Sequence, residues 1–180
     1  MTSSNKSGTT EIGYLAVSEV AGLGYCGGLL VVTATGRPVE FHCTTPVAAN
    51  RAQEILYGAT LKEFLVCDQI GIALLKKLGR LPHVVLVEER ELCKLAAQVN
   101  ASFGLFVHES NGDTEGSDIS QMDERAGGQA IEVNEVRFEI YGNEPTSIQE
   151  TLSSFSQHLP LNEPFDRIRE AINEAHREAA

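Results

Sequence analysis

The sequence lacks tryptophan altogether and is poor in other aromatic residues and in basic side chains. Aromatic residues make up 6% of the 180 positions, and 14 Lys and Arg stand against 25 Asp and Glu, which gives a net charge of −11. Nucleic acid is held mainly through its phosphates by Lys and Arg, and single strands also stack on aromatic rings. The composition therefore disfavours nucleic acid as a partner and favours a soluble, acidic protein.

Long apolar runs are also missing. No stretch approaches the roughly 20 residues that a membrane-spanning helix needs. The first residues, MTSSNKSGTT, are polar and contain no apolar segment of the kind that directs secretion. We predict a disordered tail over 1–10, no membrane association and a cytoplasmic location.

The cysteines form no C-x-x-C pair of the kind found in zinc or redox sites, because Cys26, Cys43, Cys67 and Cys93 are widely spaced. Disulfides are disfavoured in the cytoplasm. We therefore expect all four cysteines to be small buried hydrophobic residues. A thiol or zinc site that uses Cys43 or Cys26 is the alternative.

Three apolar runs separated by short turns predict an antiparallel meander. They span 12–20, 26–34 and 39–45, and glycines stand in both turns. Alternation along the third run puts Cys43 on one face with Val39 and Phe41, and His42 on the other. We expect Cys43 to lie in the core, so that His42 and Cys43 cannot act as one pair.

The apolar period changes after residue 50 and predicts helices. Residues 51–78 read as two helices, or one helix broken at 58–60, and 83–89 read as a strand buried on both faces. We predict an α/β (mixed) fold in which the antiparallel three-stranded meander is followed by α-β-α-β, with a C-terminal β-α-α extension. The domain plan is a tail at 1–10, a core at 11–108, an acidic flexible loop at 109–130, and a strand with two helices at 131–180.

This element order resembles the ribonuclease-H-like fold, and it is also compatible with a profilin- or roadblock-like layering. The first resemblance implies a cluster of carboxylates that holds two metal ions, with one carboxylate midway along the first strand. The residues available for that cluster are Glu19, Glu54 and Glu88, and they would bind Mg²⁺ or Mn²⁺.

A second candidate site lies where the third strand gives way to a helix, within FHCTTPVAANRAQEILYG. His42, Arg51 and Glu54 could surround the start of that helix, where free backbone N–H groups favour an anion. Asn50 and Gln53 have the spacing of a capping pair, which explains the same residues without any ligand.

The last helix, 164–178, carries a narrow apolar stripe on a charged surface, and this stripe could pack on its own domain or on a protein partner. No nucleotide-binding or metalloprotease motif is present. Our leading hypothesis is thus a cytoplasmic, non-catalytic binding or assembly module without a cofactor or metal. The alternatives are a ribonuclease-H-like metal-dependent nuclease or a degenerate relative, and a thiol or zinc protein.

Overall fold

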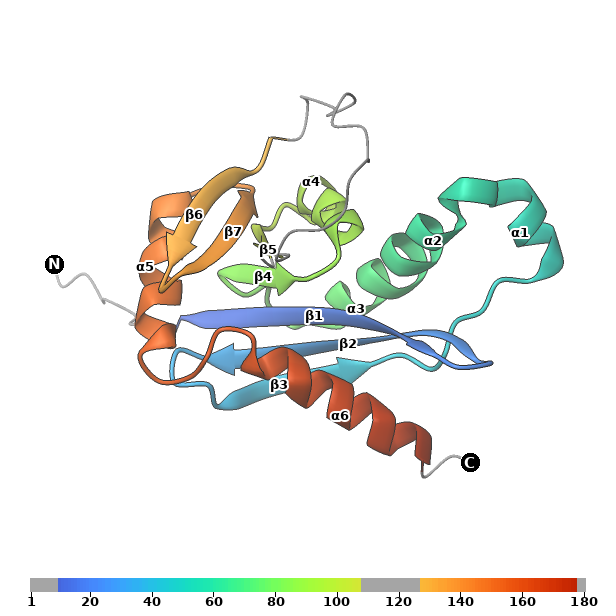
Figure 1. The fold of residues 1–180 in the computed structure, drawn as a ribbon, viewed down its shortest axis with the longest axis horizontal. Coiled ribbons are helices and arrows are strands. Elements are labelled where there is room, and N and C mark those ends of the chain that lie inside the picture. The colour runs from blue at the N-terminus through green and yellow to red at the C-terminus, as the bar shows by residue number, and fades with distance from the viewer. Residues whose placement is uncertain (1–9, 108–126, 178–180) are drawn as a thin grey trace, which may run out of the picture.

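A seven-stranded mixed sheet forms the centre of the molecule in a computed structural model, which describes residues 10–107 and 127–177 (Figure 1). The strand order is β3-β2-β1-β4-β5-β7-β6. The strands are β1 (Glu11–Val20), β2 (Gly24–Thr33), β3 (Pro38–Cys43), β4 (Val84–Val87), β5 (Phe103–Val107), β6 (Gln129–Val133) and β7 (Val136–Tyr141). The predicted tail at 1–10 and acidic loop at 109–130 lie largely outside the described residues.

Strands β1, β2 and β3 form the predicted antiparallel meander. The β1–β2 ladder runs from Glu11 opposite Thr33 to Val20 opposite Gly24. Gly22 and Gly24 have φ values of +76° and +102°, which L-residues with a side chain rarely adopt, so glycine suits this tight turn.

Strand β4 lies parallel to β1, and β5 lies parallel to β4. All four residues of β4 are buried, as the continuous apolar run predicts. Strand β7 returns antiparallel to β5 and pairs with β6 through a tight turn. In that turn Asn134 and Glu135 have φ values of 48° and 66°, which are typical of a two-residue hairpin loop.

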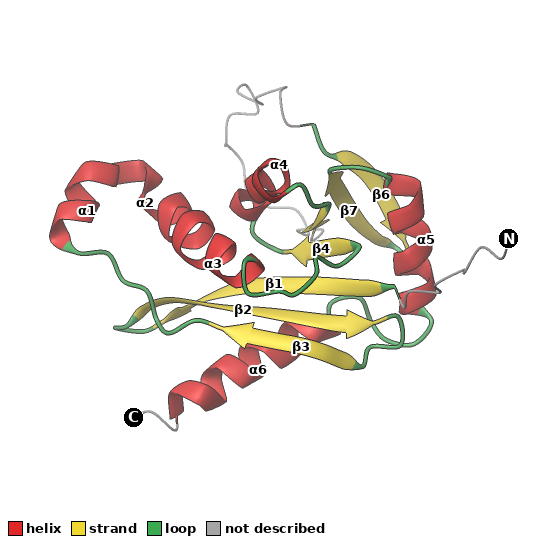
Figure 2. Ribbon diagram, turned by 180° about the vertical axis from the view of Figure 1, so that it is seen from behind, coloured by secondary structure: helices red, strands yellow, loops and turns green. Residues whose placement is uncertain are grey.

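Helices cover both faces of the sheet. They are α1 (Arg51–Tyr57), η1 (Gly58–Thr60), α2 (Leu61–Glu63), η2 (Phe64–Gly71), α3 (Ile72–Leu75), η3 (Arg90–Lys94), α4 (Leu95–Val99), α5 (Pro145–Ser156) and α6 (Glu163–Arg177). The predicted break at 58–60 is present, with Gly58 at φ 50°. Segments η2 to α4 pack on one face, and α5 and α6 pack on the other (Figure 2).

The apolar stripe of α6 is buried within this chain. Phe165, Ile168 and Ile172 are at most 1% exposed and belong to one core cluster with residues of β1 and β2. Arg167 Nη1 also donates to the carbonyl of Gly36, 131 residues away, over 2.8 Å. The stripe is therefore unavailable for the partner or homo-oligomer contact considered for helix 164–178.

Cys43 is exposed, contrary to the expectation that it lies in the core. Strand β3 is the edge strand of the sheet, and α6 contacts β1 and β2. The alternation correctly groups Cys43 with Val39 and Phe41, which are 50% and 40% exposed, so this face of the edge strand is only partly covered. Within the described residues, none of the helices has the length and apolar character to cross a membrane.

Candidate functional site at the end of strand β4

The end of β4 meets the middle of β1 because these strands run parallel and Leu15 stands opposite Val87. Ala16 of β1 is buried in the same cluster as Leu86, on the face that α6 covers. Glu88 follows two positions after Leu86, so strand alternation directs it to the same face, beside Ala16. The sheet thus places one carboxylate at the point where β1 and β4 meet.

Arg169 of α6 completes this site by pairing with Glu88. A second nitrogen of the same guanidinium binds Asp166 at 3.0 Å, one turn earlier on the helix. The Glu88 side chain is 20% exposed and that of Arg169 is 41% exposed, so the pair lies partly in solvent. We call Ala16, Glu88, Asp166 and Arg169 the β4-end site.

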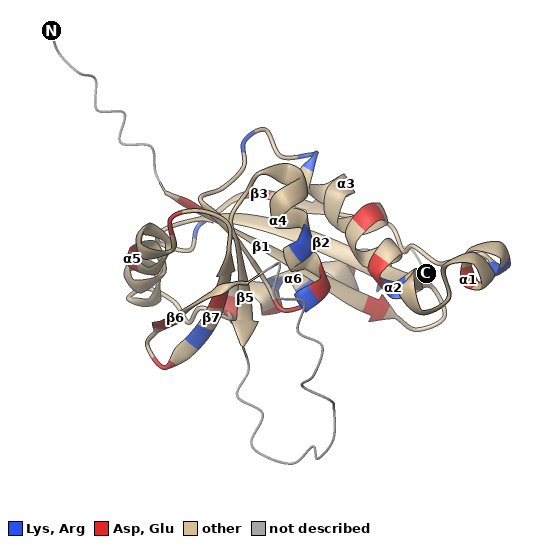
Figure 3. Ribbon diagram, turned by 90° about the horizontal axis from the view of Figure 1, so that it is seen from above, with Lys and Arg blue, Asp and Glu red and all other residues tan. Residues whose placement is uncertain are grey.

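The opposite face of the same strand end is crossed by ion pairs between α2 and the segment after β4. Lys62 Nζ lies 2.9 Å from Glu89 Oε2, and Lys94 Nζ lies 2.7 Å from Glu63 Oε2. These hydrogen bonds raise the pKa of both lysines. Figure 3 shows basic segments beside acidic ones near α4 and α6.

A third ion pair joins η3 to the far part of the sheet. Arg90 Nη1 lies 2.8 Å from Glu139 Oε2, and the hydroxyl of Tyr141 donates to the same carboxylate oxygen over 2.8 Å. The bond from Arg90 lowers the pKa of Glu139, whereas burial followed by the bond to Glu139 raises the pKa of Tyr141 to about 12. The segment after β4 is therefore anchored on both sides.

The three carboxylates considered for a metal cluster are placed apart. Glu19 stands near the end of β1 opposite Tyr25, and Glu54 lies on α1 in an ion pair with Arg51 at 2.9 Å. Glu88 alone reaches the β4-end site. Within residues 10–107 and 127–177, no group of three His, Cys, Asp or Glu side chains could hold a metal ion.

The donor chemistry of the β4-end site does not fit a pair of divalent cations. Mg²⁺ requires several oxygen ligands in near-octahedral geometry, including carboxylates. Between Glu11 and Glu19, strand β1 offers no carboxylate, and Ala16 directly follows Leu15, the residue that stands opposite Val87. The guanidinium of Arg169 already supplies positive charge to Glu88.

At the corner after β3, the predicted residues form two separate pairs. His42 Nε2 lies 2.6 Å from Glu40 Oε1, and Arg51 pairs with Glu54 on a helix that buries none of its residues. No described hydrogen bond or ion pair links His42 to Arg51 or Glu54. The predicted cap is present: Asn50 Oδ1 accepts from the backbone N–H of Gln53 at 2.9 Å, and Gln53 Oε1 accepts from the backbone N–H of Asn50 at 3.0 Å.

The remaining cysteines are buried, and the described residues form no thiol or zinc cluster. Burial raises the pKa of Cys67 to about 11 and that of Cys93 to about 12. Cys26 Sγ donates to the carbonyl of Thr44 at 2.9 Å, and burial raises its pKa as well. These three thiols fit the prediction of core residues.

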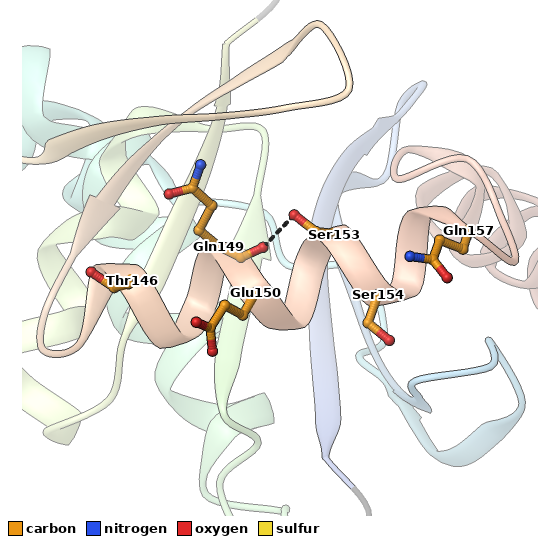
Figure 4. A pocket seen from close by; sticks show the side chains of 6 residues that line it. All are labelled: Thr146, Gln149, Glu150, Ser153, Ser154 and Gln157. Atoms are coloured by element: carbon orange, nitrogen blue, oxygen red, sulfur yellow. Dashed lines mark hydrogen bonds between the residues drawn. The ribbon is translucent and has the colours of Figure 1, made fainter.

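A shallow depression lies on the outer face of α5 (Figure 4). Its walls are the polar side chains of Thr146, Gln149, Glu150, Ser153, Ser154 and Gln157. The hydroxyl of Ser153 donates a hydrogen bond to the carbonyl of Gln149 over 2.7 Å. Five of the six belong to α5 and Gln157 follows it directly, so none of the lining groups of this surface converges from another element.

Sequence reasoning missed Arg169. It lies 81 residues from Glu88 and belongs to a helix whose charged positions all look solvent-facing in the sequence. The resemblance to the ribonuclease-H-like fold was the available signal for this site, and it predicts a cluster of carboxylates and not a basic residue.

No protein-family model and no curated protein matches this sequence. Among solved structures, human endonuclease V has a TM-score of 0.52 at 14% identity, covering 96% of this chain and 87% of that chain. The catalytic domain of human endonuclease V has a TM-score of 0.53 at 16% identity, covering 94% and 85%. A complex of Ciona intestinalis endonuclease V with a 23mer DNA containing an inosine followed by a ribo-adenosine has a TM-score of 0.54 at 11% identity, covering 97% and 88%.

These comparisons confirm the mixed α/β class and identify the fold as ribonuclease-H-like. They also contradict two predictions. The leading hypothesis of a non-catalytic protein-binding or assembly module is wrong, because the chain shares its fold with a nuclease over nearly its whole length. The fold favours instead the alternative of a ribonuclease-H-like nuclease or a degenerate relative. The prediction from composition that nucleic acid is an unlikely partner is overturned as well, because one of these similar structures is a DNA complex. A net charge describes the whole chain and does not exclude a local contact surface. At this level of identity, the likeness establishes that this chain has the fold of endonuclease V.

Proposed function

We propose that this chain is a degenerate relative of the ribonuclease-H-like nucleases and that its ligand is a nucleic acid strand. The proposal depends most on one observation, the Glu88–Arg169 ion pair beside Ala16. The resemblance to nucleases of this fold implies metal-bound carboxylates, one of them midway along the first strand. Here an alanine stands in the middle of β1, and a guanidinium balances the carboxylate after β4.

The nucleic-acid part of the proposal is supported by the fold shared with a DNA-complexed endonuclease V. Most basic residues near the β4-end site are already paired with carboxylates, so few phosphates would be neutralised. Each neutralised phosphate adds to the steepness with which affinity falls as salt rises. We therefore expect weak binding with a shallow dependence on salt.

The direct test measures fluorescence anisotropy of labelled single-stranded DNA, single-stranded RNA and duplex DNA over a range of salt concentrations. We expect at least one of them to bind at low salt, and Arg169→Ala to weaken that binding several-fold. Arg177→Ala is the matched control, because Arg177 is another arginine of α6 and pairs with Glu174 at an exposed position. If none of these ligands binds at low salt, the nucleic-acid proposal is wrong.

A second measurement tests whether the chain has lost metal-dependent nuclease activity. Wild-type protein is incubated with the same nucleic acids and millimolar Mg²⁺ or Mn²⁺, and divalent-cation binding is followed by calorimetry. We expect neither cleavage nor heat of binding. Cation-dependent cleavage that Glu88→Gln abolishes would show instead that the chain is an active nuclease.

A gain-of-binding variant sharpens this test. Arg169→Asp would remove the guanidinium and place a carboxylate near Glu88 and Asp166, which are the present partners of Arg169. Oxygen-rich sites of this kind bind divalent cations, and a ligand that binds only the folded state raises the melting temperature. We expect Mn²⁺ to raise the Tm of Arg169→Asp and to leave that of the wild type unchanged.

A further inference from the structure

Strand β3 leaves one long side of the sheet open. Among the described residues, it stands last in the strand order and pairs only with β2. On the face of the sheet on which α6 packs, β3 exposes Val39, Phe41 and Cys43. Val39 is 50% exposed and Phe41 is 40% exposed. An uncovered edge with apolar side chains is a template for pairing with another strand.

The backbone groups of this edge alternate in direction. The N–H of Thr44 donates to the carbonyl of Gly27 at 2.9 Å, so Thr44 faces β2. Because successive residues of an antiparallel strand point their N–H and C=O groups to opposite sides, His42 also faces β2 and Phe41 faces outward. Pro38 and the register shift near Val31 restrict the regular part of the edge to 40–43.

We propose that β3 of a second copy of this chain pairs antiparallel with this edge, with a two-fold axis at Phe41. In this register Phe41 stands opposite Phe41 of the second copy, and Glu40 stands opposite His42. The proposal concerns a surface separate from the β4-end site and is independent of the nucleic-acid function.

The order of residues in β3 favours a second copy over an unrelated strand. The sequence VEFHC places a carboxylate on one side of Phe41 and an imidazole on the other, and apolar residues at both ends. Rotation by a half turn about Phe41 therefore matches each acid with a base and each apolar residue with another. Cross-strand pairs of an acidic with a basic side chain, and of two aromatic rings, both stabilise a sheet.

Packing on the α6 face supports the same arrangement. Phe41 lies at the margin of the core cluster, since a Cβ added to Gly28 would lie 3.5 Å from Phe41 Cε2 and 2.4 Å from Ile168 Cγ2. A second Phe41 ring would extend this apolar surface across the interface. The Glu40–His42 pairs of the two copies would lie together on the opposite face, where each His42 gains a second carboxylate.

Disulfide cross-linking tests the register. Directly opposed residues that exchange backbone hydrogen bonds have Cα atoms about 5.5 Å apart, within the range that a disulfide spans. Phe41→Cys in a Cys43→Ser background should therefore form a covalent dimer under mild oxidation. Glu40→Cys in the same background is the control, because its two copies would be roughly 8 Å apart and should cross-link far more slowly.

Sedimentation or light scattering over a range of concentrations tests the association itself. The wild type should form a dimer, and Phe41→Lys should shift it to a monomer by placing two like charges face to face. Leu56→Lys is the matched control, because Leu56 of α1 is 81% exposed and lies away from β3, and it should remain dimeric. A wild type that is monomeric at every concentration, or equal cross-linking at positions 40 and 41, would overturn the proposal.

Discussion

Tyr14 shows how a single buried group departs from the usual pairing rules. Its ring packs edge-on against Phe165 with centroids 5.1 Å apart, while its hydroxyl has no hydrogen-bond partner among the described residues. Burial, followed by the charge of Glu163, raises its pKa. An unpaired buried hydroxyl destabilises the folded state because its hydrogen bond to water is lost without replacement.

We therefore predict that Tyr14→Phe leaves the free energy of unfolding unchanged or raises it by about 1 kcal/mol. Tyr141→Phe is the comparison, because its hydroxyl donates to Glu139 and accepts from Arg90, and its loss should lower stability. Urea unfolding of both variants gives the measurement. A clear loss of stability in Tyr14→Phe would mean that the hydroxyl has a partner in solution.

The four thiols should divide into one accessible and three protected groups. Cys43 is exposed, whereas Cys26, Cys67 and Cys93 are buried and burial raises their pKa values. The thiolate is the reacting form, so a raised pKa and burial both slow the reaction. At mildly alkaline pH we expect one thiol to react quickly with a disulfide reagent and the other three only after unfolding. Cys43→Ser should abolish the fast phase, and a fast phase that survives it would contradict this assignment.

At the scale of elements, the contact between α6 and the sheet depends on a glycine, Gly28, at the point of closest approach. A Cβ added to Gly28 would lie 2.4 Å from Ile168 Cγ2 and 3.2 Å from Ile172 Cδ1. Methyl groups on branched side chains cannot move away without shifting the helix, because the interior is close-packed. Gly28 thus lets α6 approach β2 closely.

We predict that Gly28→Ala lowers the free energy of unfolding by about 1–3 kcal/mol, the usual range for an overpacked core. Gly79→Ala is the control, because an added Cβ there meets no atom within 4 Å, and its effect should stay within about 0.5 kcal/mol. Urea denaturation measures both. Equal stability of the two variants would mean that α6 packs less closely than described.

The elements themselves were largely predictable because their signals are local. Turn glycines mark the β1–β2 hairpin, and the unbroken apolar run of β4 indicates a strand buried on both faces. The exposure of Cys43 was not predictable, since alternation tells which residues share a face and not whether a helix covers it. The Glu88–Arg169 pair had no local signal either, because it joins β4 to α6 across 81 residues.

For the whole molecule, α6 is part of the core and not an appendage. Its residues Phe165, Ile168 and Ile172 bury their side chains against the same cluster as Tyr14 and Leu30. Burial of one large apolar side chain contributes about 1.5–3 kcal/mol, and the total stability of a domain is only about 5–15 kcal/mol. Loss of several such side chains is therefore comparable to the stability of the fold.

Removal of residues 160–180 should accordingly abolish cooperative unfolding. We expect the shortened chain to bind a hydrophobic dye and to lose its near-ultraviolet circular dichroism, because the α6 face of the sheet becomes exposed. The variant Glu174→Ala, in which only an exposed pair with Arg177 is lost, should keep both native signals. A truncated chain with a native spectrum and a sharp melting transition would show that α6 is dispensable.

The hydrogen bond between Arg167 and Gly36 also bears on the rate of folding. It joins residues 131 positions apart, and the core cluster on this face draws its members from both ends of the described chain. Chains dominated by such distant contacts fold slowly, because loop closure costs entropy before the contacts form. During synthesis, the β1–β2 hairpin can form early, but the apolar face that α6 will cover stays exposed until residues 163–177 have been made. This nascent hairpin is therefore the segment on which we expect chaperones to act.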